Sequence, residues 1–243
     1  MAGSLPVQKR QNQNVKEKKM FSAEKYVSSL LSILKKDFGE RLLYVGLQGS
    51  YLRGEATEDS DIDIMVVIDN LSPADMLAYR RAIESLEGCE KSCGFICGGD
   101  EMRNWNPLEI CHLLHTTKDY YSSLSKLVPA YTDKDVRAFV KMSVGNLYHE
   151  ICHRFIHAPR EKSVSKLPMS HKGVFFILQN LHYLESGEFI GTKKELLDAL
   201  SGMDKEVLET ALAYGRGENV DFDKAFELLF AWCKDALVRT ARE

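Results

Sequence analysis

The chain has 243 residues, of which 44% are hydrophobic and 28% are charged, and its formal net charge is −3. This composition matches average soluble proteins and excludes a disordered, fibrous or collagen-like chain. No apolar run approaches the roughly 20 residues that a membrane-spanning helix needs, so no membrane partner is expected. The acidic balance argues against nucleic acid as a partner, although a local basic groove is compatible with it.

The N-terminal segment, residues 1–19, is polar and contains neither an apolar core nor a small-residue cleavage site. It lacks the features of a secretory signal, so we expect a cytoplasmic protein whose residues 1–19 form a flexible tail. The six cysteines include no C-x-x-C pair. This spacing favours reduced, mostly buried thiols over disulfides or a zinc site.

The first half of the chain alternates helical and strand-like patterns bounded by glycine or proline. Helix-spaced apolar residues behind Ser22 predict one amphipathic helix, and the pair Ser72-Pro73 predicts the start of another. Unbroken apolar runs predict buried strands, because strands covered on both faces lack polar alternation. The predicted helices span residues 22–37 and 72–86, and the predicted strands span residues 42–47, 61–69, 94–97 and 108–115.

The second half is helical in pattern from residue 133 onward. This change predicts a domain boundary, with one domain over residues 20–130 and a helical bundle over residues 131–243. The predicted fold class is therefore α+β, with a mixed, partly antiparallel sheet and flanking helices followed by an α-helical bundle. The predicted bundle helices span residues 133–157, 170–186, 192–200, 204–213 and 222–240.

One stretch carries recognisable chemistry: GSYLRG, which begins at Gly49, followed by SDIDIMVV, which begins at Ser60. Gly49 lets the backbone approach a phosphate, and Ser50 offers a hydroxyl and an N–H group at a helix start, where anions bind. Asp61 and Asp63 are two residues apart in a strand, so both carboxylates point to the same face. Because Mg²⁺ is usually held by one or two carboxylates plus substrate phosphates, the pattern predicts a metal and triphosphate site.

This pattern resembles the signature of the nucleotidyltransferase superfamily: an apolar strand, Gly-Ser, a spacer, and Asp-x-Asp between aliphatic residues. The resemblance is strongest over residues 42–68, and the small bacterial antibiotic adenylyltransferases likewise place a helical bundle after the catalytic domain. It implies that Asp61 and Asp63 bind Mg²⁺, with two ions expected, and that Ser50 contacts nucleotide phosphate. It also implies transfer of a nucleoside monophosphate, from ATP or another triphosphate, to a hydroxyl of a small-molecule acceptor such as an antibiotic.

The family also uses a third carboxylate, on a later strand, as a metal ligand or as the base for the acceptor hydroxyl. Glu109, at the start of the predicted strand 108–115, is our first candidate for both roles. Asp100 and Glu101 are alternatives, and a chain without this carboxylate would bind nucleotide without catalysis. The candidate nucleotide-binding residues are Gly49, Ser50, Arg53, Ser60 and Lys172, the last because related adenylyltransferases bring a lysine from such a bundle helix to the triphosphate.

A second motif is H-E-x-x-H, formed by His149, Glu150 and His153, which in zinc proteases binds the metal on a helix. A zinc hydrolase would leave the Gly-Ser and Asp-x-Asp pattern unexplained, and the metzincin extension is missing. We therefore expect these histidines to line the cleft between the two domains or to lie on a helix face. A nucleotidyltransferase acting on protein or RNA, as in toxin and antitoxin pairs, and a non-catalytic nucleotide-binding module remain alternatives.

Overall fold

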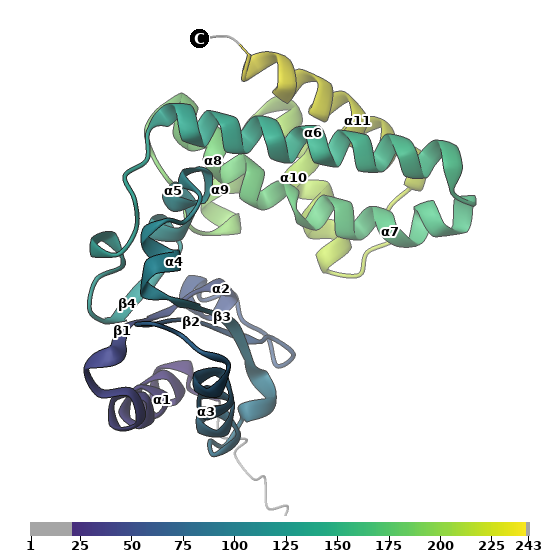
Figure 1. Cartoon of the computed structure of the whole chain (residues 1–243). Helices are drawn as coiled ribbons and strands as arrows, with labels where there is room; N and C mark the ends of the chain where they lie inside the picture. Colours follow the sequence, from purple (N-terminus) through teal and green to yellow (C-terminus); the bar gives the residue numbers. More distant parts are fainter. Residues whose placement is uncertain (1–20, 242–243) are drawn as a thin grey trace, which may run out of the picture.

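The structure is a computed structural model, and it describes residues 21–241. The predicted tail, residues 1–19, lies outside the described residues. The described chain forms a sheet half, residues 23–121, and a helical half, residues 133–239, which extends above one side of the sheet (Figure 1). None of the helices in the described range combines the length and the apolar character that crossing a membrane requires.

The sheet contains four strands in the spatial order β3-β2-β1-β4. β2 runs parallel to β3, whereas β1 runs antiparallel to both β2 and β4. This arrangement confirms the predicted mixed, partly antiparallel sheet. The strands are β1 (Leu42–Leu47), β2 (Ile62–Ile68), β3 (Ser92–Gly98) and β4 (Lys118–Tyr121).

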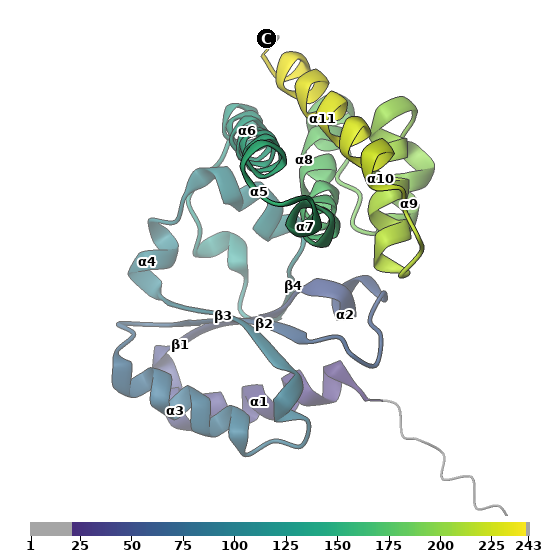
Figure 2. The same cartoon turned by 90° about the vertical axis from the view of Figure 1, so that its right-hand side faces the viewer.

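The lower face of the sheet is covered by α1 (Ala23–Phe38) and α3 (Pro73–Glu84), as Figure 2 shows. Both helices begin as their sequences predict: the Ser22 side chain accepts a hydrogen bond from a first-turn N–H, and Ser72 forms a capping box with Asp75. Alternate residues of β2 point down into this core, so the intervening residues must face up. This lower core consists of fully buried residues and includes Leu30 and Leu34 of α1 and Ile62, Ile64, Val66 and Ile68 of β2.

The upper face carries a smaller core around Met65 and Val67 of β2. Two short helices, α4 (Gly99–Arg103) and α5 (Pro107–His115), lie above it (Figure 2). Asp63 precedes Met65 on this same side of the strand, because residues two apart in a strand share a face. The aspartate pair therefore belongs to the face that looks toward the helical half.

The predicted strand 108–115 is wrong, because this segment is the helix α5. The pair Asn106-Pro107 is a helix-start signal that the sequence contains. In the structure, the Asn106 side chain accepts a hydrogen bond from the Leu108 N–H, and Pro107 occupies the first helical position. The fourth strand is instead β4, which was not predicted. The strand predicted at 94–97 is found as β3, beginning two residues earlier.

The helical half is built around α6 (Asp133–His157), which packs against α5, α7, α8 and α11. The predicted helix 170–186 is in fact the end of one helix and the whole of another, which meet at Gly173. The first of these contains Pro168 and begins at Arg160, ten residues before the predicted start at residue 170. The remaining helices are α7 (Arg160–Lys172), α8 (Val174–Ser186), α9 (Lys193–Ala199), α10 (Gly202–Gly215) and α11 (Phe222–Arg239).

Candidate active site

The turn after β1 is fitted tightly against the start of β2. The five-residue helix α2 (Gly49–Arg53) begins at Gly49, whose φ of +72° is in the left-handed region that favours glycine. A Cβ atom at this position would overlap the Asp63 carboxylate. The Gln48 N–H also donates a 2.8 Å hydrogen bond to the Asp63 carbonyl. Only glycine therefore lets this turn and the aspartate occupy neighbouring positions.

Asp61 and Asp63 form a pair of like charges at the beginning of β2. Burial and the charge of Asp61 raise the pKa of Asp63, and the charges of Arg53 and Lys172 oppose this effect in part. Within residues 21–241, no group of three metal-binding side chains is present. Two carboxylate ligands, whose negative charge Arg53 and Lys172 offset only in part, suit Mg²⁺ if substrate phosphates and water complete its coordination.

Two cations from opposite halves of the chain act on this pair. Arg53, at the end of α2, is 13% exposed, donates a 2.9 Å hydrogen bond to Glu55 and lies 5.6 Å above the Phe175 ring of α8. Lys172 is the last residue of α7, and its charge lowers the pKa of Asp63. The structure thus brings both predicted cations into the surroundings of Asp63.

Glu55 joins the two halves next to this site, and the sequence did not point to it. Its carboxylate accepts a 2.7 Å hydrogen bond from the Lys193 backbone N–H at the start of α9, and the Lys193 Nζ lies 3.7 Å away. Burial alone would raise the pKa of Glu55, but the bonds from Arg53 and Lys193 outweigh it and hold the pKa below its ordinary value. Glu55 therefore fixes Arg53 and attaches the helical half to the loop before β2.

The position facing Asp63 on the neighbouring strand holds a thiol. In the parallel register of β2 and β3, Asp63 pairs with Cys93, and β3 contains no carboxylate. Asp100 and Glu101 begin α4 beyond the other end of β3, about 16 Å along the strand from Cys93 at about 3.3 Å per residue. This distance separates both alternative carboxylates from the aspartate pair.

Glu109 lies on a helix and not, as predicted, at the start of a strand. Its carboxylate accepts a 2.7 Å hydrogen bond from the Trp105 indole, and that ring packs edge-on against Phe95 of β3 at 5.0 Å. Phe95 is two residues beyond Cys93, so these groups share the upper face of the sheet. A role for Glu109 as base or metal ligand stays a prediction.

The two serines of the motif have local roles in the fold. The Ser60 hydroxyl accepts a 2.8 Å hydrogen bond from the Thr57 N–H and closes the turn that leads into Asp61. The Ser50 carbonyl accepts a 2.9 Å hydrogen bond from the Glu55 N–H. Their predicted contacts with nucleotide remain predictions.

The H-E-x-x-H segment does not assemble a zinc protease site. Glu150 forms an ion pair with Arg154, so its carboxylate is not free to act as the base of such a site. In the described range, no third ligand joins His149 and His153. The zinc hydrolase alternative therefore has no geometric support.

Comparison with known proteins agrees with the geometry around Gly49 and Asp63. Residues 27–96 match the family model described as nucleotidyltransferase domain. The chain carries a nucleotidyltransferase domain. The matched range includes β1, α2, β2 and most of β3, which are the elements that position the aspartate pair.

The nucleotidyltransferase domain is similar in sequence to the protein adenylyltransferase MntA of Thermococcus cleftensis, with 45% identity over 65 residues. This match covers 26% of the chain and 66% of the relative, just under two thirds of its length. A solved structure, a spectinomycin adenyltransferase from Enterococcus faecialis with ATP and spectinomycin, shares the fold with a TM-score of 0.57 at 16% identity. That likeness covers 89% of the chain and 100% of the other protein, so the helical half belongs to the shared fold as well.

Proposed function

We propose that this protein is a Mg²⁺-dependent nucleotidyltransferase that moves a nucleoside monophosphate, AMP from ATP in the first instance, onto a hydroxyl group of an acceptor. The observation that carries the proposal is the packing of Asp63 against Gly49, which sets a carboxylate pair beside a phosphate-binding type of turn. The matched domain, whose description names this chemistry, supports it.

Each residue near the pair has a role in this proposal. Asp61 and Asp63 hold the metal, whereas Ser50 offers its hydroxyl and N–H to the triphosphate. Arg53 and Lys172 supply the positive charge that the triphosphate oxygens need, because their charges already act on Asp63. Bound Mg²⁺ would polarise the phosphates and neutralise the leaving pyrophosphate.

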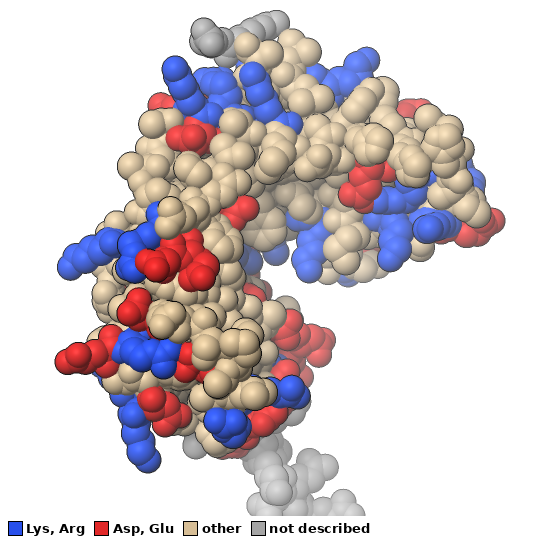
Figure 3. Space-filling model, viewed as in Figure 1, with Lys and Arg blue, Asp and Glu red and all other residues tan. Residues whose placement is uncertain are grey.

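The acceptor enters from the open space between the sheet half and the helical half (Figure 3). Its oxygen attacks the α-phosphorus in line while the bond to pyrophosphate breaks. The hydroxyl proton needs a base, and Glu109 is the candidate carboxylate on the correct face of the sheet. The Trp105 indole holds that carboxylate in place.

Two acceptor classes are supported by different observations. The fold neighbour with ATP and spectinomycin supports a small-molecule acceptor such as an antibiotic. The relative named a protein adenylyltransferase supports a hydroxyl on a macromolecule. The spectinomycin adenyltransferase is similar over most of the chain, whereas the protein adenylyltransferase has the higher sequence identity. Both acceptor classes are therefore included in the experiment below.

The test is transfer from each α-³²P-labelled nucleoside triphosphate, with Mg²⁺, to a panel of aminoglycosides, other antibiotics and a cell lysate. We expect a labelled product that depends on Mg²⁺ and disappears with Asp61→Asn or Asp63→Asn, since each variant removes a metal ligand and losing even an outer-shell partner of a ligand costs about 10–100-fold in activity. A protein that binds Mg²⁺-ATP without transferring label to any acceptor would be a nucleotide-binding module. Full activity of both variants would refute the assignment of the pair.

A further inference from the structure

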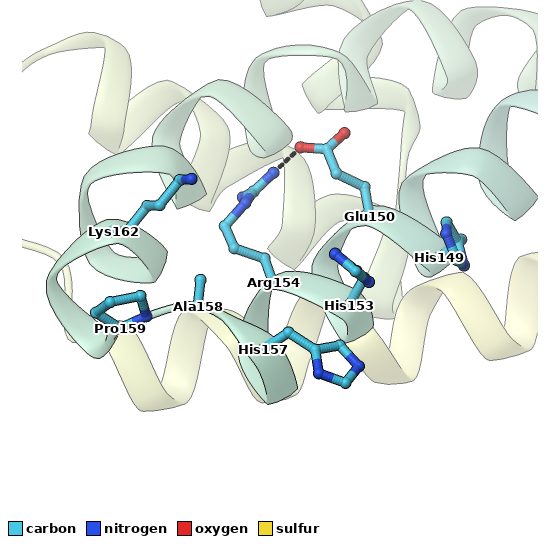
Figure 4. Close-up of a pocket in the computed structure, with 8 residues that line it drawn as sticks. All are labelled: His149, Glu150, His153, Arg154, His157, Ala158, Pro159 and Lys162. Atoms are coloured by element: carbon cyan, nitrogen blue, oxygen red, sulfur yellow. Dashed lines mark ion pairs between the residues drawn. The ribbon is translucent and has the colours of Figure 1, made fainter.

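A hollow of about 430 Å³ lies in the groove between the end of α6 and the start of α7 (Figure 4). It includes the whole H-E-x-x-H segment, and the proposed transfer reaction does not use it. A volume of this size is in the range of sites for small organic ligands. Its polar lining consists of His149, Glu150, His153, Arg154, His157 and Lys162.

The hollow is positively charged, although the whole chain is acidic. Its single carboxylate among the lining residues, Glu150, is paired with Arg154. Lys162 forms no ion pair within residues 21–241, so its charge is available to a ligand. Imidazole side chains add positive charge whenever they are protonated. Figure 3 shows lysine and arginine side chains gathered along the lower edge of the helical half, where α7 runs.

Arg154 is held in place by two buried serines of α7. Its guanidinium donates a 3.0 Å hydrogen bond to the Ser170 hydroxyl, and its carbonyl accepts a 3.2 Å hydrogen bond from the Ser163 hydroxyl. Both serines are 6% exposed, and the Arg154 side chain is 13% exposed. A cation fixed in this way loses little side-chain freedom when it binds a ligand. A guanidinium also has five N–H donors, more than its contacts with Ser170 and Glu150 require.

The carboxylate that neutralises Arg154 is itself exposed. The Glu150 side chain is 55% exposed, and it also accepts a 3.2 Å hydrogen bond from the Ser170 hydroxyl. Ion pairs with an exposed partner contribute little to stability, so another anion can replace Glu150 at Arg154. A phosphate is well suited to do so, because it presents more charge and more acceptor oxygens than a carboxylate and matches the planar fork of arginine.

Flat rings and carbon surface lie beside the cations. His149, His153 and His157 follow one another at every fourth position of α6, so they share one face of the helix. Their ring centroids are 5.9 Å and 4.8 Å apart in sequence order. Ala158 and Pro159 complete the lining. Such surfaces can contact the carbon skeleton or ring that carries a phosphate group.

We propose that the hollow is a binding site for a small phosphorylated anion, held by Arg154, Lys162 and His153 and separate from the aspartate pair. The inference goes beyond the proposed function and does not depend on it, because the hollow is lined by the helical half alone. Phosphate is the shared chemistry of inorganic phosphates and of organic ones such as nucleotides. A metal ion does not fit equally well, since no three metal-binding side chains come together in the described range.

Isothermal titration calorimetry tests the binding on the Asp63→Asn protein in EDTA, so that no metal holds an anion at the aspartate pair. Pyrophosphate and AMP are the two probes, titrated at constant ionic strength, and their comparison identifies whether an organic group is bound as well. Lys162→Glu should weaken binding about tenfold or more, because repulsion replaces a charge-assisted hydrogen bond. Glu150→Gln should tighten binding about threefold or more, because it removes the competing carboxylate from Arg154.

Lys166→Glu is the matched control for Lys162→Glu. It reverses an exposed charge one turn further along α7, and Lys166 is not part of the lining. We expect it to change Kd by less than about twofold, because solvent and salt screen a charge outside the site. Both lysines are exposed, so both variants should melt with the parent protein.

Three results would overturn the inference: no binding of either anion, equal weakening by Lys162→Glu and Lys166→Glu, or loss of binding in Arg53→Ala but not in Lys162→Glu. The last result would place the anion at the aspartate pair. Transfer from labelled ATP is measured separately on the wild-type protein. If an acceptor is labelled but no anion binds through Lys162, the inference fails and the proposed function stands. If anions bind through Lys162 and no acceptor is ever labelled, the inference stands and the proposed function fails.

Discussion

Cys93 of β3 lies opposite Asp63 of β2 in the parallel register of the two strands. The nucleotidyltransferase family places a third carboxylate on a later strand, so this neighbour is a natural place for one. A thiol contributes no negative charge to the hard oxygen site that Mg²⁺ prefers. The site therefore has the two carboxylates of Asp61 and Asp63, and a third carboxylate could be placed at position 93.

Cys93→Asp should strengthen the metal site. We expect the apparent affinity for Mg²⁺ in the transfer reaction to rise by about 10-fold to 100-fold, because a third oxygen ligand joins the pair. In the absence of Mg²⁺ the same change should lower the melting temperature, since three like charges repel. A Mg²⁺ titration of the transfer rate and a thermal melt with EDTA measure both effects. Cys93→Ser is the control, and an unchanged Mg²⁺ requirement in Cys93→Asp would show that position 93 does not face the metal.

Gly49→Ala should remove transfer activity. The alanine Cβ would overlap the Asp63 carboxylate, and the left-handed φ of +72° adds a backbone cost of about 1–2 kcal/mol. Gly54→Ala is a matched control, because its φ is +69° and a Cβ there meets nothing within 4 Å. Both variants should lose similar stability in a thermal melt, and only Gly49→Ala should lose activity. Equal activity losses would mean that backbone strain, and not the displaced carboxylate, is responsible.

Asp63→Asn should raise the stability of the metal-free protein while it abolishes transfer. Burial and Asp61 raise the pKa of Asp63 above its ordinary 3.8, so folding favours the protonated carboxyl. The protonated Asp63 side chain therefore contributes fully to the free energy of unfolding below pH 3.8. This contribution is lost as the pH rises through the raised pKa, because the carboxyl group becomes charged. Thermal melts with EDTA should show Asp63→Asn above wild type at pH 7 and level with it near pH 3. Mg²⁺ with ATP should raise the melting temperature of the wild type alone.

Glu55→Gln should loosen the attachment between the two halves. It removes a half-buried charge that accepts hydrogen bonds from Arg53 and Lys193, which costs about 1–3 kcal/mol. Because these partners hold the pKa of Glu55 below its ordinary 4.5, its contribution is full above that value and is lost as the pH falls through the lowered pKa. The difference in melting temperature from wild type should therefore shrink in acid.

The control for Glu55 is Glu218→Gln. Arg216 and Glu218 form an ion pair at the same two-residue spacing, but both side chains are more than half exposed. Exposed pairs contribute about 0–1 kcal/mol, so this variant should melt close to the wild type. A drop for Glu218→Gln as large as that for Glu55→Gln would contradict a special role for the attachment at Glu55.

Local sequence determined much of this protein. Caps and periodicity predicted α1, α3 and α6, because Ser22, Ser72 and the helical spacing behind them act within a few residues. The common face of Asp61 and Asp63 is likewise a property of any strand, and the Gly-Ser turn identified the nucleotidyltransferase chemistry. Where two local signals competed, at 108–115, the apolar run misled the prediction and the Asn106-Pro107 start was the better guide.

Tertiary structure alone decided the surroundings of the pair. Cys93 faces Asp63 only because of a register between strands about 30 residues apart, and the polar β4 is a strand only because β1 offers it an edge. Glu55, Lys193 and the hollow beside His153 likewise depend on how the helical half sits above the sheet. Contacts between distant segments follow from packing, which no local pattern encodes. The sequence thus determined the chemistry of the site, and the packing of the two halves decided which side chains surround it.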